Sequence, residues 1–321
     1  MKPAALVVLS AAVAVHAHNA AAQAYPVKPI RLIVGSQAGG NLDIVGRSLA
    51  QGLTEGLGRR VIVENRPGAN ASIAAEYVAR AAPDGYTLLM AASTLTNAPS
   101  FARNIPYDPV RDFTGVSLVA RIHQALVVHP SLPVRTVREL ITLAKAQAGK
   151  LNYASSSVGS GSFMAMELFK RRAGVNLVRI GYNGDAPALV DLLGGQVPVK
   201  FDNFTTSIPH VKSGRLRALG VSSPQASPLL PGVPPVAETL PGFEASIFNG
   251  VVAPAATPRD VVGRLHAEIV KFVQLPEVRS RFSQQGVDLQ ASPAPDQFSA
   301  FLKEETVRAA QIARDAGIHP E

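Results

Sequence analysis

The stretch PIRLIVGSQAGGNLDIVGRSLA, Pro29 to Ala50, joins a strand pattern to a helical pattern. Residues 30–34 are apolar and predict a buried strand, and apolar residues recur at helical spacing from 45 to 53. The loop between them is made of small or polar residues and contains Gly39 and Gly40. Such a junction leaves free backbone N–H groups at the positive end of a helix dipole. It therefore predicts either an ordinary turn, with Asn41 or Asp43 capping the helix, or a site for an anion such as a carboxylate.

The same alternation of strand and helix continues along the chain. Helical patterns end at Gly58, Gly149, Gly174 and Gly194, where glycine suits a helix terminus. This rhythm predicts an α/β fold with mostly parallel sheets flanked by helices. The other predicted strands of this rhythm are Val61–Glu64, Tyr86–Ala91, Asn152–Ser155, Leu177–Gly181, Val197–Asp202 and Leu216–Val221.

Two extended apolar segments, Val116–Val128 and Ile247–Ala253, depart from that rhythm. We interpret them as crossings between two lobes. They predict a discontinuous first lobe of residues 25–124 plus 247–321 and a second lobe of residues 125–246. The last helical pattern, Pro295 to Ala316, carries an apolar face that should pack on the first lobe.

The N-terminus predicts export. Lys2 precedes an Ala-, Leu- and Val-rich run, and Ala22-Gln23-Ala24 fits a cleavage site for small residues. Residues 1–24 therefore predict a signal peptide cleaved near Ala24, and a soluble periplasmic protein after it. The net charge of +8 is dispersed and not interleaved with aromatic residues, so nucleic-acid binding is not expected.

Two more strand-to-helix junctions resemble the first. One is Asn152 to Phe169, which is rich in serine and glycine around Ser155 to Ser162. The other is Gly181 to Leu189. Loops at strand ends are where open α/β sheets bind ligands, so these loops extend the predicted anion site.

The sequence gives little support for an enzyme. It has no cysteine, no G-x-S-x-G elbow and no Gly-rich phosphate loop. His123, His129, His210, His266 and His319 are scattered without metal spacing. We expect no catalytic residue, no metal site and no cofactor, and keep a secreted hydrolase as a remote alternative.

Nine segments together resemble one family, the Bug-type periplasmic receptors of tripartite tricarboxylate transporters. The resemblance covers essentially all of residues 25–321. It implies a two-lobed type II periplasmic-binding-protein fold whose cleft between the lobes holds a small carboxylate through backbone groups, hydroxyls and ordered water. The matching segments are YPVKPIRLIV, VIVENRPGA, AAPDGYTLLM, LNYAS, APALVDLLGGQV, FDN, GRLRALGV, APAATP and AGIHPE.

The resemblance leaves the identity of the acid open between a di- or tricarboxylate, an acidic amino acid and an aromatic acid. It implies a monomer that delivers its ligand to membrane transporter components, with presentation to a sensor kinase as the alternative. The predicted ligand-binding residues are Ser36, Gln37, Ala38, Gly39, Gly40, Asp43, Ser93, Ser155, Ser156, Gly159, Ser160, Gly161, Tyr182, Gly184, Ala186 and Asp202.

The sequence departs from the family at two places. Ser36, Gln37 and Ala38 replace an aromatic-x-Pro start of the first loop, and Lys200 replaces an apolar residue before Phe-Asp-Asn. Strand alternation puts Lys200 and Asp202 on one face. For Lys200 this favours an ion pair or a solvent-facing side chain over a ligand contact.

Overall fold

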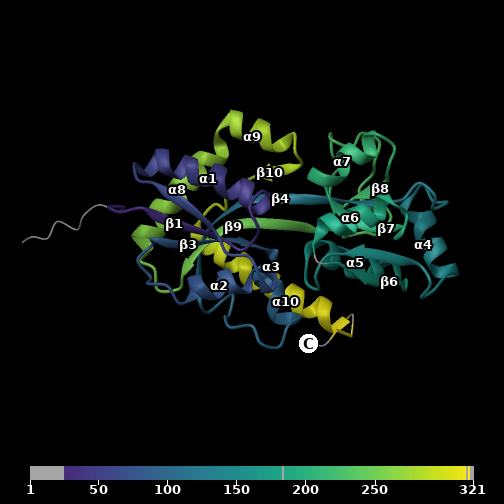
Figure 1. Cartoon of the computed structure of the whole chain (residues 1–321), viewed down its shortest axis with the longest axis horizontal. Coiled ribbons are helices and arrows are strands. Elements are labelled where there is room, and N and C mark those ends of the chain that lie inside the picture. The colour runs from purple at the N-terminus through teal and green to yellow at the C-terminus, as the bar shows by residue number, and fades with distance from the viewer. Residues whose placement is uncertain (1–24, 183, 316, 319–321) are drawn as a thin grey trace, which may run out of the picture.

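Two long strands, β4 (Phe113–Val128) and β9 (Ser246–Pro254), run antiparallel between two halves of the molecule (Figure 1). The computed structural model describes residues 25–182, 184–315 and 317–318, so the predicted signal peptide lies outside the described residues. β4 pairs with β9 as far as His123, and from Gln124 onward it pairs with β7 and β8 of the second half. The assignment of the flanking residues to two lobes with boundaries at 124/125 and 246/247 stays a prediction.

The remaining strands divide between the two halves. The first half contains β1 (Ile30–Val34), β2 (Val61–Asn65), β3 (Thr87–Ala92) and β10 (Val287–Leu289), and the second contains β5 (Asn152–Ser155), β6 (Val178–Gly181), β7 (Val199–Asn203) and β8 (Arg217–Val221).

Helices flank both sheets (Figure 1). In chain order they are α1 (Asn41–Leu57), α2 (Ser72–Ala79), α3 (Ser93–Asn97), α4 (Val137–Ala146), α5 (Gly161–Ala173), α6 (Asp185–Leu193), α7 (Phe204–Lys212), α8 (Arg259–Gln274), α9 (Pro276–Ser283) and α10 (Pro295–Asp315), with short 3₁₀ turns at Ala69–Ala71, Ala98–Ser100 and Val236–Glu238.

The strand directions determine where the loops lie. β3 is antiparallel to β9, and β9 is antiparallel to β4, so β3 runs with β4 toward the second half. β1 and β2 follow β3 because they pair in parallel. β7 is antiparallel to β4 and therefore runs toward the first half, as do β5 and β6. The carboxyl ends of β1–β3 and of β5–β7 thus face each other across the crossing strands.

The predicted parallel pairing is confirmed within β1–β3 and within β5–β7, while every pair that involves β4 or β9 is antiparallel. The helix ends at Gly58 and Gly174 are confirmed, and both glycines adopt positive φ. α7 was not predicted, and it contains Pro209, a residue that normally argues against a helix interior.

Apolar side chains of α1 and α8 cover one face of the first sheet, where Leu49, Leu53 and Leu265 are fully buried. Each contributes about 1.5–3 kcal/mol relative to exposure. α10 buries the predicted face, but it does not pack on the first half alone. Its Ala313 packs against Phe163 of the second half, so α10 spans the boundary between the halves.

The crossing strands leave no room for a side chain at Gly250. A Cβ there would lie 2.2 Å from Cζ of Phe298 and 2.9 Å from the carbonyl oxygen of Ser117. We expect Gly250→Ala to lower the free energy of unfolding by about 1–3 kcal/mol through overpacking.

Gly263 in α8 is the matched control, since a Cβ there meets nothing within 4 Å. Gly263→Ala should raise the free energy of unfolding by up to about 1 kcal/mol, because alanine is the better helix former. Urea unfolding of both variants measures the difference, and equal effects of the same sign would contradict the packing argument.

Candidate functional site

The first loop owes its shape to Gly39 and to the buried Asp43. Gly39 has φ +83°, a conformation that disfavours side chains, and its N–H donates to Oδ2 of Asp43 at 2.9 Å. Gly40 has an ordinary φ of −74°, and a Cβ there would make only ordinary contacts, at 3.4 Å or more. The loop's own backbone therefore requires glycine at 39 but not at 40.

Asp43 is held from three sides. Besides the Gly39 amide, it accepts hydrogen bonds from Nε of Arg47 at 2.9 Å and Nδ2 of Asn65 at 2.8 Å. Burial alone would raise the pKa of Asp43, but these hydrogen bonds outweigh it and hold the pKa below its usual value. The carboxylate is thereby occupied and neutralised beneath the loop.

The capping expectation for this loop was wrong in one respect. The N-cap of α1 is Gly40, with no side-chain cap, and Oδ1 of Asn41 is buried without a hydrogen-bond partner among the described residues. Asp43 accepts a hydrogen bond from the Gly39 amide, so this amide is not available to a ligand. Oγ of Ser36 is likewise buried and unpartnered among the described residues, so this loop keeps unused polar groups.

The second loop carries a network of hydroxyl groups centred on Ser162. Its Oγ lies 3.3 Å from both the amide N and Oγ of Ser156, 3.2 Å from Oγ of Ser160 and 3.4 Å from Oδ1 of Asp185. All four distances are long for hydrogen bonds that involve a hydroxyl group. Ser162 thus has several hydrogen-bond partners, but each of these bonds is weak. A stronger acceptor can therefore compete for the donors.

Two predicted residues of this loop also have structural roles. Ser160 is the N-cap of α5, and its Oγ accepts from the amide of Phe163 at 3.3 Å. A Cβ on Gly161 would lie 2.4 Å from Cγ1 of Ile247 in β9. The lack of a side chain at 161 thus lets α5 pack against a crossing strand, which is a reason for glycine that the sequence analysis missed.

A cation reaches this loop from the neighbouring strand. Arg179 of β6 donates to Oγ of Ser155 at 2.8 Å and to the carbonyl oxygen of Ser156 at 2.6 Å. Arg179 lies outside the three loops whose residues were predicted to bind the ligand. Arg179 pairs with Tyr153, and Tyr153 and Ser155 lie two residues apart on one face of β5. Strand alternation was therefore the sequence signal that could have pointed to this contact.

The third loop begins α6 with Gly184 as its N-cap at φ +119°. Tyr182 donates from its hydroxyl to Oδ2 of Asp191 at 2.9 Å, and burial together with that bond raises the pKa of Tyr182 to about 12. Ala186 lies exposed in the first turn of α6, next to the partly exposed Asp185.

Beneath this loop lies an ion cluster in which Lys200 and Asp202 are buried and Asp185 is partly exposed. Nζ of Lys200 is 2.5 Å from Oδ1 of Asp202 and 3.0 Å from Oδ1 of Asp185, and Thr206 donates to the other oxygen of Asp202. Burial alone would lower the pKa of Lys200, but the two carboxylates outweigh it and raise it. The ion pair expected for Lys200 is confirmed, and the solvent-facing alternative is wrong because its side chain is 0% exposed. Asp202 is equally buried, so it supports the loop from below.

The first half touches the second loop through residues that the sequence analysis did not single out. Nδ2 of Asn97 donates to the carbonyl oxygen of Gly159 at 2.9 Å, and Oγ of Ser157 donates to Oδ1 of Asn70 at 3.1 Å. Asn70 is the middle one of three consecutive non-glycine residues with positive φ. Such a backbone costs free energy, and here it brings Asn70 to the opposite half.

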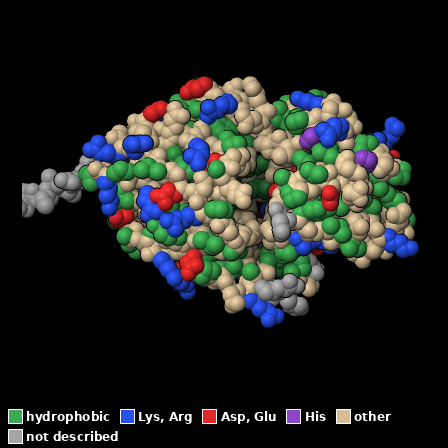
Figure 2. Space-filling view, viewed as in Figure 1, with side chains coloured by type: hydrophobic (Ala, Val, Ile, Leu, Met, Phe, Trp, Pro, Cys, Tyr) green, Lys and Arg blue, Asp and Glu red, His purple; other side chains and the backbone are tan. Residues whose placement is uncertain are grey.

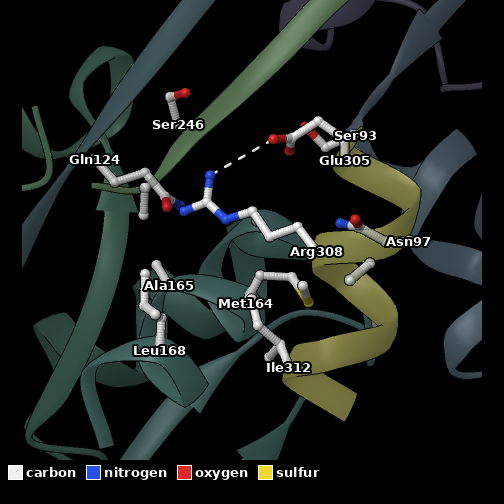
Figure 3. A pocket seen from close by; sticks show the side chains of 13 residues that line it. Ser93, Asn97, Gln124, Met164, Ala165, Leu168, Ser246, Glu305, Arg308 and Ile312 are labelled. Atoms are coloured by element: carbon white, nitrogen blue, oxygen red, sulfur yellow. Dashed lines mark ion pairs between the residues drawn. The ribbon is translucent and has the colours of Figure 1, made fainter. Parts of the chain in front are cut away.

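Ser93 and Gly161 line a cavity of about 40 Å³ between α3, α5, α10 and the crossing strands (Figure 3). The Arg308 side chain reaches into it and lies 3.5 Å from Oε1 of Glu305, the ion pair drawn in Figure 3. Typical ligand pockets measure 300 Å³ or more, so this cavity has room for ordered water only. Oγ of Ser93 accepts from the amide of Phe248 at 3.0 Å, which ties α3 to β9.

The loops at the facing strand ends border a hollow in the molecular surface between the two halves (Figure 2). Residues 37–40 and Ala186 are exposed, whereas Asp43, Ser93, Ser155, Ser156, Gly159, Ser160 and Asp202 are buried. Contact of any of these residues with a ligand stays a prediction. The described residues include no cluster of His, Cys, Asp or Glu that could hold a metal ion.

Two solved structures resemble this chain over most of its length. A structure of R. palustris Rpa4515 with adipate matches with a TM-score of 0.83 and 32% identity, covering 92% of this chain and 100% of that one. MatC (Rpa3494) from Rhodopseudomonas palustris with bound malate matches with a TM-score of 0.79 and 29% identity over 90% and 99%. The protein is thus a two-lobed solute-binding protein of the periplasmic-binding-protein fold.

The sequence comparison is more specific. Residues 45–318 match the profile of the tripartite tricarboxylate transporter family receptor. BugT of Bordetella pertussis is 37% identical over 302 residues, which cover 92% of this chain and 91% of BugT. The chain belongs to this family of Bug-type periplasmic receptors, as the resemblance implied.

The Asp43 contacts predict a pH dependence of stability. Because the folded-state pKa of Asp43 is lowered, its contribution is complete above the unfolded pKa of about 3.9 and is lost as the pH falls through the folded-state pKa. Asp43→Ala should lower the free energy of unfolding by about 1–3 kcal/mol at pH 7, and this difference should shrink below about pH 4.

Asp296→Ala is the control, since Asp296 is an exposed acid in the first turn of α10. It should cost less than about 1 kcal/mol. Urea unfolding between pH 3 and pH 7 measures both variants. An Asp43→Ala deficit that stays constant down to pH 3 would mean that the charge on Asp43 is not what stabilises the loop.

Ser36 and Ser160 should respond differently to removal of the hydroxyl. Ser160→Ala removes a helix cap and should lower the free energy of unfolding by about 0.5–2 kcal/mol. Ser36→Ala removes a hydroxyl without a partner among the described residues and should leave stability within about 0.5 kcal/mol. Thermal melts decide this, and a Ser36→Ala protein as unstable as Ser160→Ala would show that Ser36 has a structural partner.

Proposed function

We propose that the protein captures a small organic carboxylate between its two halves and delivers it to a tripartite tricarboxylate-type membrane transporter. The observation that carries this proposal is the facing arrangement of the carboxyl ends of β1–β3 and β5–β7. It brings the N-termini of α1, α5 and α6 to one region of the molecule. Helix N-termini favour anions, because their first amides lack intrahelical partners.

The polar groups of the loops support an anionic ligand. Ser36 and the Ser162 network offer hydroxyl donors, and Arg179 adds a positive charge beneath the second loop. Asp43 does not oppose an anion, since Arg47 neutralises it. The bound adipate and malate of the structural neighbours support the same class of ligand.

The work we propose is binding without bond making. The family and the neighbouring structures are solute-binding proteins. Among the described histidines, only His129 pairs with a serine hydroxyl, and that partner is the exposed Ser131. Its hydrogen bond lies outside the three loops, so it gives no support to the hydrolase alternative.

We propose a periplasmic location for the mature chain, with export by residues 1–24 and cleavage near Ala24, and a monomeric state. Family membership supports the location, because receptors of this family are periplasmic. In the described residues no helix combines the length and apolar character needed to span a bilayer.

Ligand-dependent melting tests the proposal. At a ligand concentration one hundred times the Kd, a bound acid should stabilise the folded protein by about 2.7 kcal/mol. We expect at least one of adipate, malate, citrate, glutamate and a benzoate to raise the melting temperature in a concentration-dependent way. Calorimetry should give the matching Kd.

The fully esterified form of each active acid is the control, and it should have no effect because it has no carboxylate. Folded protein that responds to none of the acids would refute carboxylate capture. Delivery is tested separately, by acid uptake in cells that carry the membrane components with and without this receptor.

A further inference from the structure

Asp185 places a carboxylate at the predicted ligand site with only part of its charge compensated. It is the first residue of α6, and its side chain is 41% exposed. Its Oδ1 is shared between Lys200 at 3.0 Å and Ser162 at 3.4 Å, and among the described residues its other oxygen has no hydrogen-bond partner. Asp185 therefore has a free acceptor at an accessible position.

The single positive charge of Lys200 cannot neutralise both Asp185 and Asp202. It is closer to Asp202, at 2.5 Å, and both of these side chains are fully buried. Coulomb attraction strengthens as distance and local dielectric fall, so the Lys200–Asp202 pair is the tighter one. The cluster carries a net charge of −1, and the exposed member, Asp185, presents it to solvent.

A positive charge lies on the other face of the same sheet. Arg179 pairs in register with Tyr153, whose hydroxyl bonds Glu167 of α5, so Arg179 lies on the α5 face. Lys200 pairs with Ala154, which packs with Ala188 of α6. Among the described residues, the hydrogen-bond partners of Arg179 are the neutral Ser155 and Ser156. The second loop thus lies between an uncompensated cation and an uncompensated anion.

We propose that Asp185 determines specificity and that the ligand is an amino acid whose protonated amine contacts Asp185. This inference rests on the proposed function and narrows it. The ligand carboxylate is held by the helix N-termini and the positive potential of Arg179, and the ammonium donates to the free oxygen of Asp185.

Other ligands of the same size fit this charge pattern less well. A second carboxylate placed near Asp185 would be repelled, as like charges are. A hydroxyl group could donate to the free oxygen but would leave the net negative charge in place. An ammonium supplies both the donor and the missing charge.

The test uses pairs of acids that differ only in the amine: succinate and aspartate, glutarate and glutamate, 3-phenylpropionate and phenylalanine. Isothermal titration calorimetry measures each Kd at pH 7 for the wild type and for Asp185→Asn. In the pair that the wild type binds, the amine-bearing acid should bind at least tenfold more tightly. Asp185→Asn should reduce that ratio at least tenfold, by weakening the amine-bearing acid and strengthening the plain one.

Two further variants make the result decisive. Glu238→Gln removes one exposed carboxylate from the same half outside the loops and should leave the ratio unchanged. Asp185→Ser repeats the test if the asparagine variant does not fold, which circular dichroism shows.

A ratio near one in the wild type, or one that Asp185→Asn leaves intact, overturns the inference while carboxylate binding still supports the proposed function. If the folded wild type binds no acid of either kind, the proposed function fails and the inference fails with it.

Discussion

The antiparallel pairing of β4 with β9 is the constraint on which the rest of the structure depends. β4 pairs with both sheets, and its direction sets that of β3 through β9 and that of β7 directly. Reversing either pairing would turn one set of strand ends away from the other. The facing loops therefore follow from strand direction, and the loop residues only have to supply suitable chemical groups.

Burying a charged side chain costs free energy of folding, and the second half of the molecule buries one at Lys200. An unpaired buried ammonium would be strongly destabilising, so Asp202 and Asp185 are required once Lys200 occupies this position. A well-packed apolar side chain would often be equally stable. The main effect of the cluster is therefore to hold Asp185 beside Ser162. Its contribution to the overall stability is smaller.

Much of the fold could be predicted from sequence because local patterns report it directly. The strand before the first loop, the Gly58 helix end and the two crossing segments all follow from periodicity and glycine position. The site was less predictable, because its contacts join residues far apart in the chain. Gly161 faces Ile247, Arg179 reaches Ser155, and Asn70 reaches Ser157 from a left-handed backbone that the flanking alanines disfavour. No local pattern encodes such pairs.

The two halves hold their loops in different ways. The first loop is fixed from beneath by Asp43, whose hydrogen bonds of 2.9 Å to Arg47 and 2.8 Å to Asn65 leave it little freedom. The hydroxyls around Ser162 are linked by bonds of 3.2–3.4 Å, which a ligand carboxylate can replace with shorter, charge-assisted ones. In the function we propose, binding would break only weak bonds in the second loop and would require little reorganisation of the first. A rigid loop facing an adjustable one is therefore a suitable arrangement for capturing a small acid and releasing it again.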